Sequence, residues 1–110
     1  MTVTLEKKKP APPLEKDIQS AIVEWMRSHG YSVDVITSGM YGGNGIADIV
    51  ACKRGRYVAV EVKRPGGKTT KLQEQWLARK TAVGGLATVA YSVQDVKEFD
   101  HYWFVEGGRA

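Results

Sequence analysis

The sequence predicts a single α/β domain in which a mixed sheet of about four strands is flanked by helices, in the order αβββαβα. Three observations lead to this expectation. Apolar residues recur at helical spacing in three segments, β-prone runs lie between these segments, and glycine or proline separates most of them. The chain has 110 residues, which is the length of one domain.

The first helix is expected between Pro13, which suits a helix start, and Gly30, which suits its end. Its apolar residues form one stripe of an amphipathic helix, made of Leu14, Ile18, Ala21, Ile22, Trp25 and Met26. Residues 1–13 contain three lysines and three of the four prolines, and we expect them to form a flexible basic tail. The folded domain would then be residues 14–110.

Three strands should follow the first helix. Residues 31–36 are a β-prone run, and a glycine-rich loop separates them from a second strand over 46–52. A tight turn at 53–55 then leads into a third strand over 56–63, which gives the second and third strands hairpin register.

The rest of the chain is expected to contain a helix, a strand and a short helix. Thr70 and Gln73 have the spacing of a capping box, and a glycine pair at 84–85 ends the helix that they begin. Residues 86–91 read as a buried strand, and Ser92 resembles the cap of the last helix. Residues 101–110 indicate no one structure.

Composition narrows the class of protein. The chain has 43% apolar residues and a net charge of +4, which is typical of an ordinary globular domain. Cys52 is the single cysteine, so neither an internal disulfide nor a zinc cluster is expected, and we interpret it as a small buried residue. No signal peptide or membrane-spanning run is visible, so we expect a cytoplasmic protein without a membrane partner. Trp25, Trp76 and Leu72 are expected in the core.

Positive charge is concentrated in one stretch. Residues 53–80 contain nine basic and two acidic residues, a net of +7, whereas the rest of the chain sums to −3. An ordinary solvated basic face is the alternative, but a surface that holds phosphates is favoured. The candidates for phosphate contacts are Lys53, Arg54, Arg56, Arg64, Lys68 and Lys71.

Two carboxylates are expected to meet at one end of the hairpin. Asp48 begins one strand and Glu61 lies near the end of the next, so hairpin pairing can place them opposite each other. Side chains alternate along a strand, so Lys63 shares the face of Glu61 while Val62 points toward the core. Such an oxygen-rich cup suits Mg²⁺ or Mn²⁺ and the hydrolysis of a phosphodiester bond. The alternative is a solvated cross-strand charge pair.

These residues resemble the PD-(D/E)xK nuclease core, and their surroundings resemble more narrowly the virus-type replication-repair nuclease (VRR-NUC) domain. The resemblance covers about residues 14–96. One departure is Ala47, where the family commonly has a proline before its first aspartate. The matching positions are Glu15, Ile18, Gln19, Gly45, Asp48, Glu61, Val62, Lys63, Gly67, Lys68, Gln73, Gly84, Gly85, Ser92, Asp95 and Val96.

The resemblance implies a restriction-endonuclease-like core and a role for each matched site residue. Asp48 and Glu61 would bind the metal through their side chains, Val62 would bind it through its carbonyl, and Lys63 would act at the nucleophile.

Glu15 and Gln73 have two interpretations each. The resemblance implies that Glu15 completes the acidic site from the first helix and that Gln73 lies beside Lys63. An acidic residue in a first helical turn is also favoured by the helix dipole, and Gln73 is also the capping-box partner of Thr70.

The glycine-rich loop contains Tyr41, which could stack on a base or lie in a simple connector. No GxGxxG or GxxxxGK[ST] pattern occurs, so binding of a nucleotide triphosphate is not expected.

The leading hypothesis is a Mg²⁺- or Mn²⁺-dependent, structure-specific DNA endonuclease. By resemblance it would act as a homodimer on branched DNA such as four-way (Holliday) junctions. The alternatives are a catalytically inactive DNA-binding module with the same fold and a nuclease that acts on RNA or single strands.

Overall fold

The computed structural model describes residues 11–37 and 45–108, which form a four-stranded mixed sheet, three α-helices and one π-helical turn. The predicted α/β class and order of elements are confirmed. Tyr41 and most of the predicted tail lie outside the described residues. The elements are α1 (Glu15–Ser28), β1 (Ser32–Val35), β2 (Ile49–Lys53), β3 (Arg56–Val62), α2 (Lys71–Ala82), β4 (Leu86–Ala90), α3 (Val93–Asp100) and η2 (His101–Val105).

The strands lie in the order β1-β2-β3-β4. The β1–β2 and β2–β3 pairs are antiparallel, whereas β3 and β4 are parallel and are connected through α2. The hairpin turns through Arg54 and Gly55, whose φ angles are +50° and +76°. Two consecutive positive φ angles are characteristic of the turns that match the twist of a two-residue hairpin.

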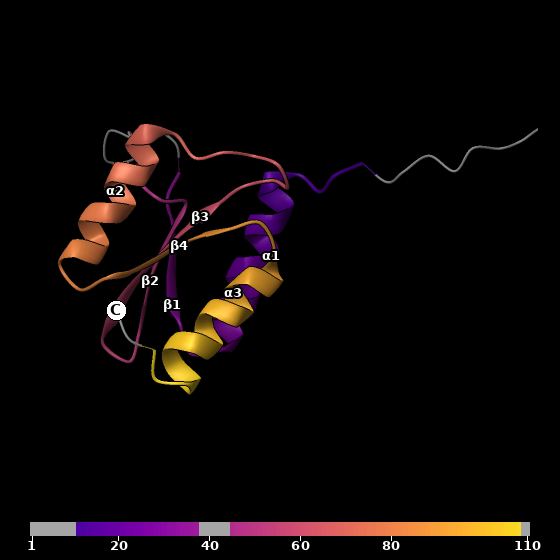
Figure 1. Cartoon of the computed structure of the whole chain (residues 1–110). Helices are drawn as coiled ribbons and strands as arrows, with labels where there is room; N and C mark the ends of the chain where they lie inside the picture. The colour runs from indigo at the N-terminus through magenta and orange to yellow at the C-terminus, as the bar shows by residue number, and fades with distance from the viewer. Residues whose placement is uncertain (1–10, 38–44, 109–110) are drawn as a thin grey trace, which may run out of the picture.

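The three helices cover both faces of the sheet (Figure 1). Helices α1 and α3 lie together on one face, and α2 lies on the other. The larger core lies under α1 and α3, and Val58, Val60 and Val62 of β3 point into it. The smaller core, under α2, contains Ala47, Ala59 and Trp76. Glu61 therefore alternates with core valines and faces the α2 side of the sheet.

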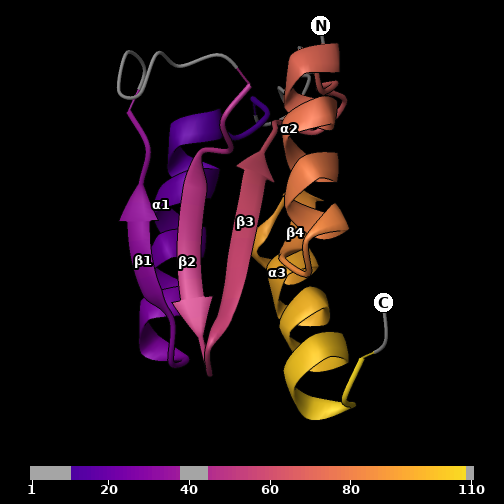
Figure 2. The same ribbon diagram turned by 90° about the vertical axis from the view of Figure 1, so that its left-hand side faces the viewer.

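Helix α2 covers only part of its face. It packs on β3 and β4, and no helix of the described residues lies over the same side of β1 and β2 (Figure 2). This partial cover explains why the sequence-based expectation of burial is wrong for two residues. Cys52 was expected to be buried but is exposed, because it lies on the open part of the face as the register partner of Tyr57. Leu72 was expected in the core but is 55% exposed in the first turn of α2, whereas Trp76 is buried as expected.

Lys53 faces the opposite side of the sheet and is buried. Its Nζ lies 2.6 Å from Asp100 Oδ1, and the Tyr31 hydroxyl donates a 2.7 Å hydrogen bond to the same oxygen. The ammonium group also lies over the rings of Tyr31 and Phe104. Lys53 is thus committed to joining the hairpin turn to the C-terminal segment, and it is not part of the DNA-contacting surface proposed below.

No helix within the described ranges is both long enough and apolar enough to cross a lipid bilayer.

Asp100→Ala should lower the free energy of unfolding by about 3–5 kcal/mol, because it leaves the buried Lys53 charge without a partner. Glu98→Ala removes an exposed carboxylate from the same helix and should change this free energy by less than about 0.5 kcal/mol. Urea unfolding followed by circular dichroism measures both effects. Equal stabilities of the two variants would show that the buried pair does not hold the C-terminal segment in place.

Candidate active site

Two carboxylates meet at the end of the sheet where β2 begins and β3 ends. The pairing of Ile49 with Val60, continued by one residue, places Asp48 opposite Glu61 as the sequence predicts. Asp48 Oδ2 accepts a 2.8 Å hydrogen bond from the Val62 backbone N–H. The Asp48–Glu61 position is thus a non-hydrogen-bonded pair, in which opposing side chains lie closest.

We call the Asp48 and Glu61 side chains, with the Val62 carbonyl, the carboxylate cup. In an extended strand the N–H and C=O groups of one residue point to the same edge. Because the Val62 N–H points toward Asp48, the Val62 carbonyl also faces that edge of β3. Three oxygen-bearing groups therefore belong to one end of the hairpin.

Glu61 is almost completely buried, with 1% of its surface exposed. Its Oε1 atom accepts a 3.0 Å hydrogen bond from Gln73 Nε2 and lies 3.6 Å from Lys63 Nζ. Its Oε2 atom is buried and accepts no hydrogen bond from residues 11–37 and 45–108. Burial is the largest cause that raises the pKa of Glu61 from 4.5 to about 8, followed by the charge of Asp48 and by a side-chain hydrogen bond with Asp48. An ionised Glu61 is therefore costly in the folded protein unless a further cation is present.

Gln73 connects the start of α2 to this carboxylate. Its backbone N–H donates to Thr70 Oγ1 at 3.2 Å, and its Oε1 accepts from the Thr70 backbone N–H at 2.9 Å, which confirms the capping box. Its Nε2 is still available to donate to Glu61. The capping interpretation of Gln73 is confirmed, and its side chain also reaches the cup, although at Glu61 rather than at Lys63.

Glu15 approaches the cup without joining it. It is the first residue of α1, and its charge is the weakest of the influences that raise the pKa of Glu61. Within the described ranges, no three His, Cys, Asp or Glu side chains gather closely enough to hold a metal ion. The structure thus brings Asp48, Glu61, Val62, Lys63 and Gln73 together, and it leaves Glu15 at the periphery.

Gly45 positions the segment that leads to Asp48. Its φ angle is +79°, and a Cβ atom at this residue would lie 2.5 Å from the Leu72 carbonyl oxygen. The backbone before Asp48 therefore packs directly on the first turn of α2, which is the turn that contains Gln73. The sequence marks Gly45 as part of a glycine-rich loop, but it gives no sign of this contact.

The basic candidates divide into two groups. The first group is exposed beside the cup, between the end of β3 and the start of α2, and consists of Arg64, Lys68 and Lys71. Arg54 and Arg56 lie at the opposite end of β3, where Arg54 donates to the Phe104 carbonyl at 3.1 Å and Arg56 lies over the Trp103 ring. Only the first group is placed to contact a phosphate that is held at the cup.

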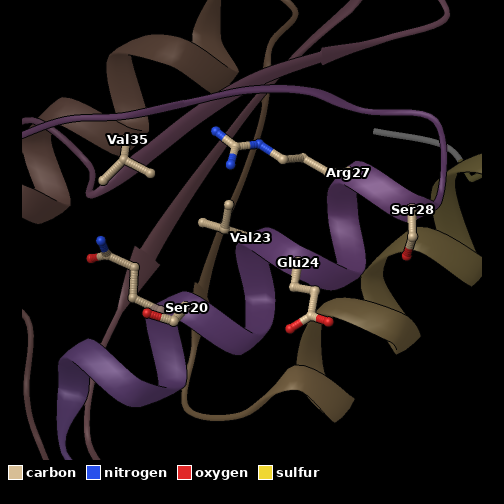
Figure 3. A pocket seen from close by; sticks show the side chains of 7 residues that line it. Ser20, Val23, Glu24, Arg27, Ser28 and Val35 are labelled. Carbon is tan, nitrogen blue, oxygen red and sulfur yellow. The ribbon is translucent and has the colours of Figure 1, made fainter.

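A cavity of about 600 Å³ lies along α1 and β1, away from the cup (Figure 3). Glu24 and Arg27 line it with opposite charges, and Arg27 donates a 3.4 Å hydrogen bond to the Val33 carbonyl at the sheet edge. Neither cup carboxylate lines this cavity, so it is separate from the candidate chemistry.

Comparison with protein-family models, curated proteins and solved structures finds no match to this chain. The assignment of a function therefore depends on the geometry and chemistry of the cup and its surroundings.

Gly45→Ala should destabilise the protein by more than Gly55→Ala does. Both residues have positive φ, which costs a side-chain-bearing residue about 1–2 kcal/mol. A Cβ at Gly55 would meet nothing within 4 Å, whereas at Gly45 it would overlap the α2 backbone. Urea unfolding measures the free energy of unfolding of each variant. The difference between the two variants gives the cost of the overlap with the α2 backbone at Gly45, because the cost of positive φ is common to both. Equal losses would contradict the close approach at Gly45.

The stability of the metal-free protein should fall between about pH 4.5 and pH 8 because of Glu61. Its folded-state pKa is higher than its unfolded-state pKa, so the folded protein holds the proton more tightly across this interval, and ionisation disfavours folding. Melting temperatures in EDTA, measured from pH 5 to pH 8, should fall more steeply for the wild type than for Glu61→Gln. Glu98→Gln, which changes an exposed glutamate, should follow the wild type. Parallel curves for the wild type and Glu61→Gln would contradict the raised pKa.

Proposed function

We propose that this chain is a divalent-metal-dependent DNA endonuclease with a PD-(D/E)xK core, similar to VRR-NUC nucleases, that cleaves branched DNA such as four-way junctions. The observation that carries the proposal is the state of Glu61, whose buried Oε2 accepts no hydrogen bond from the described residues and whose neighbour across the hairpin is a second carboxylate. Ionisation of Glu61 would place two like charges together in a buried site, and a bound cation would offset that cost.

The donor atoms fit a hard cation. Asp48, Glu61 and the Val62 carbonyl offer only oxygen, which suits Mg²⁺ or Mn²⁺, whereas zinc sites in proteins are mostly built from Cys and His. Such an ion would polarise a phosphoryl oxygen and lower the pKa of water.

Lys63 and Gln73 have complementary roles in this proposal. The Lys63 ammonium, with its side chain 14% exposed, lies 3.6 Å from Glu61 and would stabilise the negative charge that develops on the attacked phosphate. Gln73 is a positioning residue, because it holds Glu61 Oε1 and leaves Oε2 for a ligand. Glu15 would add negative charge at a greater distance.

The surface beside the cup suits a polyanion. The exposed Arg64, Lys68 and Lys71 would hold the phosphates on either side of the bond that is cut. By resemblance the active form is a homodimer, and a two-fold pair of sites would match the two-fold symmetry of a four-way junction.

The proposal is tested with labelled four-way junction, flap, linear duplex and single-stranded substrates, in Mg²⁺ and in Mn²⁺. We expect the branched DNA to be cut. Glu61→Gln and Lys63→Met should each reduce kcat by about 10²–10³-fold or more with little change in KM, since they remove interactions made in the transition state.

Lys97→Ala is the matched control, because Lys97 is an exposed lysine on α3, on the other face of the sheet. It should cut at the wild-type rate. Full activity in Glu61→Gln or Lys63→Met would overturn the assignment of the site. DNA binding in EDTA without cleavage in Mn²⁺ would indicate the inactive binding module, and cleavage of a matched RNA alone would indicate a ribonuclease.

A further inference from the structure

The first turn of α2 contacts both of the segments that contribute carboxylates to the cup. The Leu72 carbonyl packs so closely on Gly45, three residues before Asp48, that a Cβ atom at Gly45 would lie 2.5 Å from the carbonyl oxygen. One residue further along the helix, Gln73 Nε2 donates a 3.0 Å hydrogen bond to Glu61 Oε1. The geometry of the cup therefore depends on how the start of α2 is held.

The capping box of α2 fixes the orientation of the Gln73 amide. The Thr70 backbone N–H can only donate a hydrogen bond, so the Gln73 atom that lies 2.9 Å from it is the amide oxygen, Oε1. The amide nitrogen is consequently the atom that faces Glu61. Thr70 Oγ1 closes the box by accepting a 3.2 Å hydrogen bond from the Gln73 backbone N–H, which holds the backbone that carries this side chain.

Glutamine at position 73 serves the helix and the carboxylate at the same time. Glutamate can form the same capping box as glutamine. Its second carboxylate oxygen would then face Glu61 Oε1, so an ionised Glu61 would meet an acceptor where it now has a donor. The amide of Gln73 thus lets one side chain cap α2 and hold Glu61, and the cap itself determines which end of the amide reaches the cup.

We propose that Thr70 is a positioning residue of the cup, which acts through Gln73 to hold Glu61 Oε1 and so leaves Oε2 as the atom that a metal ion binds. Oε1 accepts the Gln73 hydrogen bond, whereas Oε2 is buried and accepts none from residues 11–37 and 45–108. Residues that orient a metal ligand without touching the metal typically change metal affinity by about 10–100-fold. This inference rests on the proposed function, because the metal ion belongs to that proposal.

The orientation is tested first in the metal-free protein, through the side-chain amide resonances of Gln73. The hydrogen bond to Glu61 should slow the exchange of the Nε2 protons with water. Thr70→Val keeps the shape of the side chain but removes the acceptor of the cap, and it should remove most of this protection. Thr70→Ser keeps an acceptor at the same place and should retain the protection.

Binding of Mn²⁺, measured by isothermal titration calorimetry, tests whether Thr70 acts through Gln73. Gln73→Leu should weaken the Kd about 10–100-fold and Thr70→Val about tenfold, the range for residues that orient a metal ligand. In the double variant, Thr70→Val should add less than about twofold to the loss from Gln73→Leu, because both changes act on the same carboxylate. Thr70→Ser should bind Mn²⁺ like the wild type.

Two control variants separate positioning from a loss of helix stability. Ser92→Ala removes the 3.2 Å hydrogen bond that caps α3, on the other face of the sheet. It should lower the melting temperature about as much as Thr70→Val does, without changing the Kd for Mn²⁺. Thr69→Ala removes a neighbouring hydroxyl that donates to Glu74, and it should also leave the Kd unchanged.

Four results would overturn the positioning role of Thr70. These are unchanged protection of the Gln73 amide in Thr70→Val, unchanged Mn²⁺ affinity of that variant, additive losses in the double variant, and an equal weakening of Mn²⁺ binding by Ser92→Ala. A wild-type protein that binds no Mn²⁺, but that loses the Gln73 protection in Thr70→Val, would instead support the orientation of Glu61 by Thr70 and overturn the metal-dependent activity.

Discussion

The burial of Glu61 is the constraint on which the candidate site depends. The residue belongs to a strand whose neighbouring residues, Val60 and Val62, are completely buried in the larger core, so its position along β3 cannot shift without moving valines out of that core. Its carboxylate consequently remains on the α2 side of the sheet, where its polar neighbours among the described residues are Asp48, Gln73 and Lys63. The stability of the sheet thus holds an ionisable group in an unfavourable environment.

The rest of the molecule is arranged around the two ends of the hairpin. At the turn, Lys53 and Asp100 form a buried ion pair of 2.6 Å, and this pair joins the C-terminal segment to the sheet. At the open end, the cup has a buried Glu61 oxygen that accepts no hydrogen bond from the described residues and a raised pKa, and the backbone contact at Gly45 fixes the distance between its segment and α2. The buried charges are therefore paired at one end of the hairpin, whereas a buried carboxylate at the other end has a raised pKa. Such a contrast is typical of a protein that gives up stability for a functional site.

Much of the fold could be predicted because its determinants are local. The capping box at Thr70, the cap at Ser92 and the alternation along β3 each depend on neighbouring residues, and all three were found where the sequence placed them. The pairing of Asp48 with Glu61 could be predicted for the same reason, since a short turn sets the register of a hairpin. The hydrogen bond from Gln73 to Glu61 was not predicted by spacing alone, because it depends on the packing of α2 against the sheet.

The features that could not be predicted from the sequence depend on how the helices pack across the sheet. The exposure of Cys52 and Leu72 depends on which half of a face α2 covers, and periodicity does not encode that. The burial of Lys53 depends on Asp100, which is 47 residues away in the sequence. The position of Glu15 could not be predicted from the sequence either, because the packing of α1 against the sheet determines how near its carboxylate comes to the cup. The cavity of about 490 Å³ that Val50, Tyr57 and Trp76 line also depends on how α2 lies across the sheet.

We propose that the carboxylate cup binds a divalent cation. The most direct measurement is a titration of ¹⁵N-labelled protein with Mn²⁺, followed by the paramagnetic broadening of its amide resonances. We expect substoichiometric Mn²⁺ to broaden first the amide resonances of Asp48, Glu61, Val62 and Lys63, and Glu61→Gln to abolish this selectivity. Broadening spread evenly over the exposed carboxylates, or centred on another part of the surface, would contradict it.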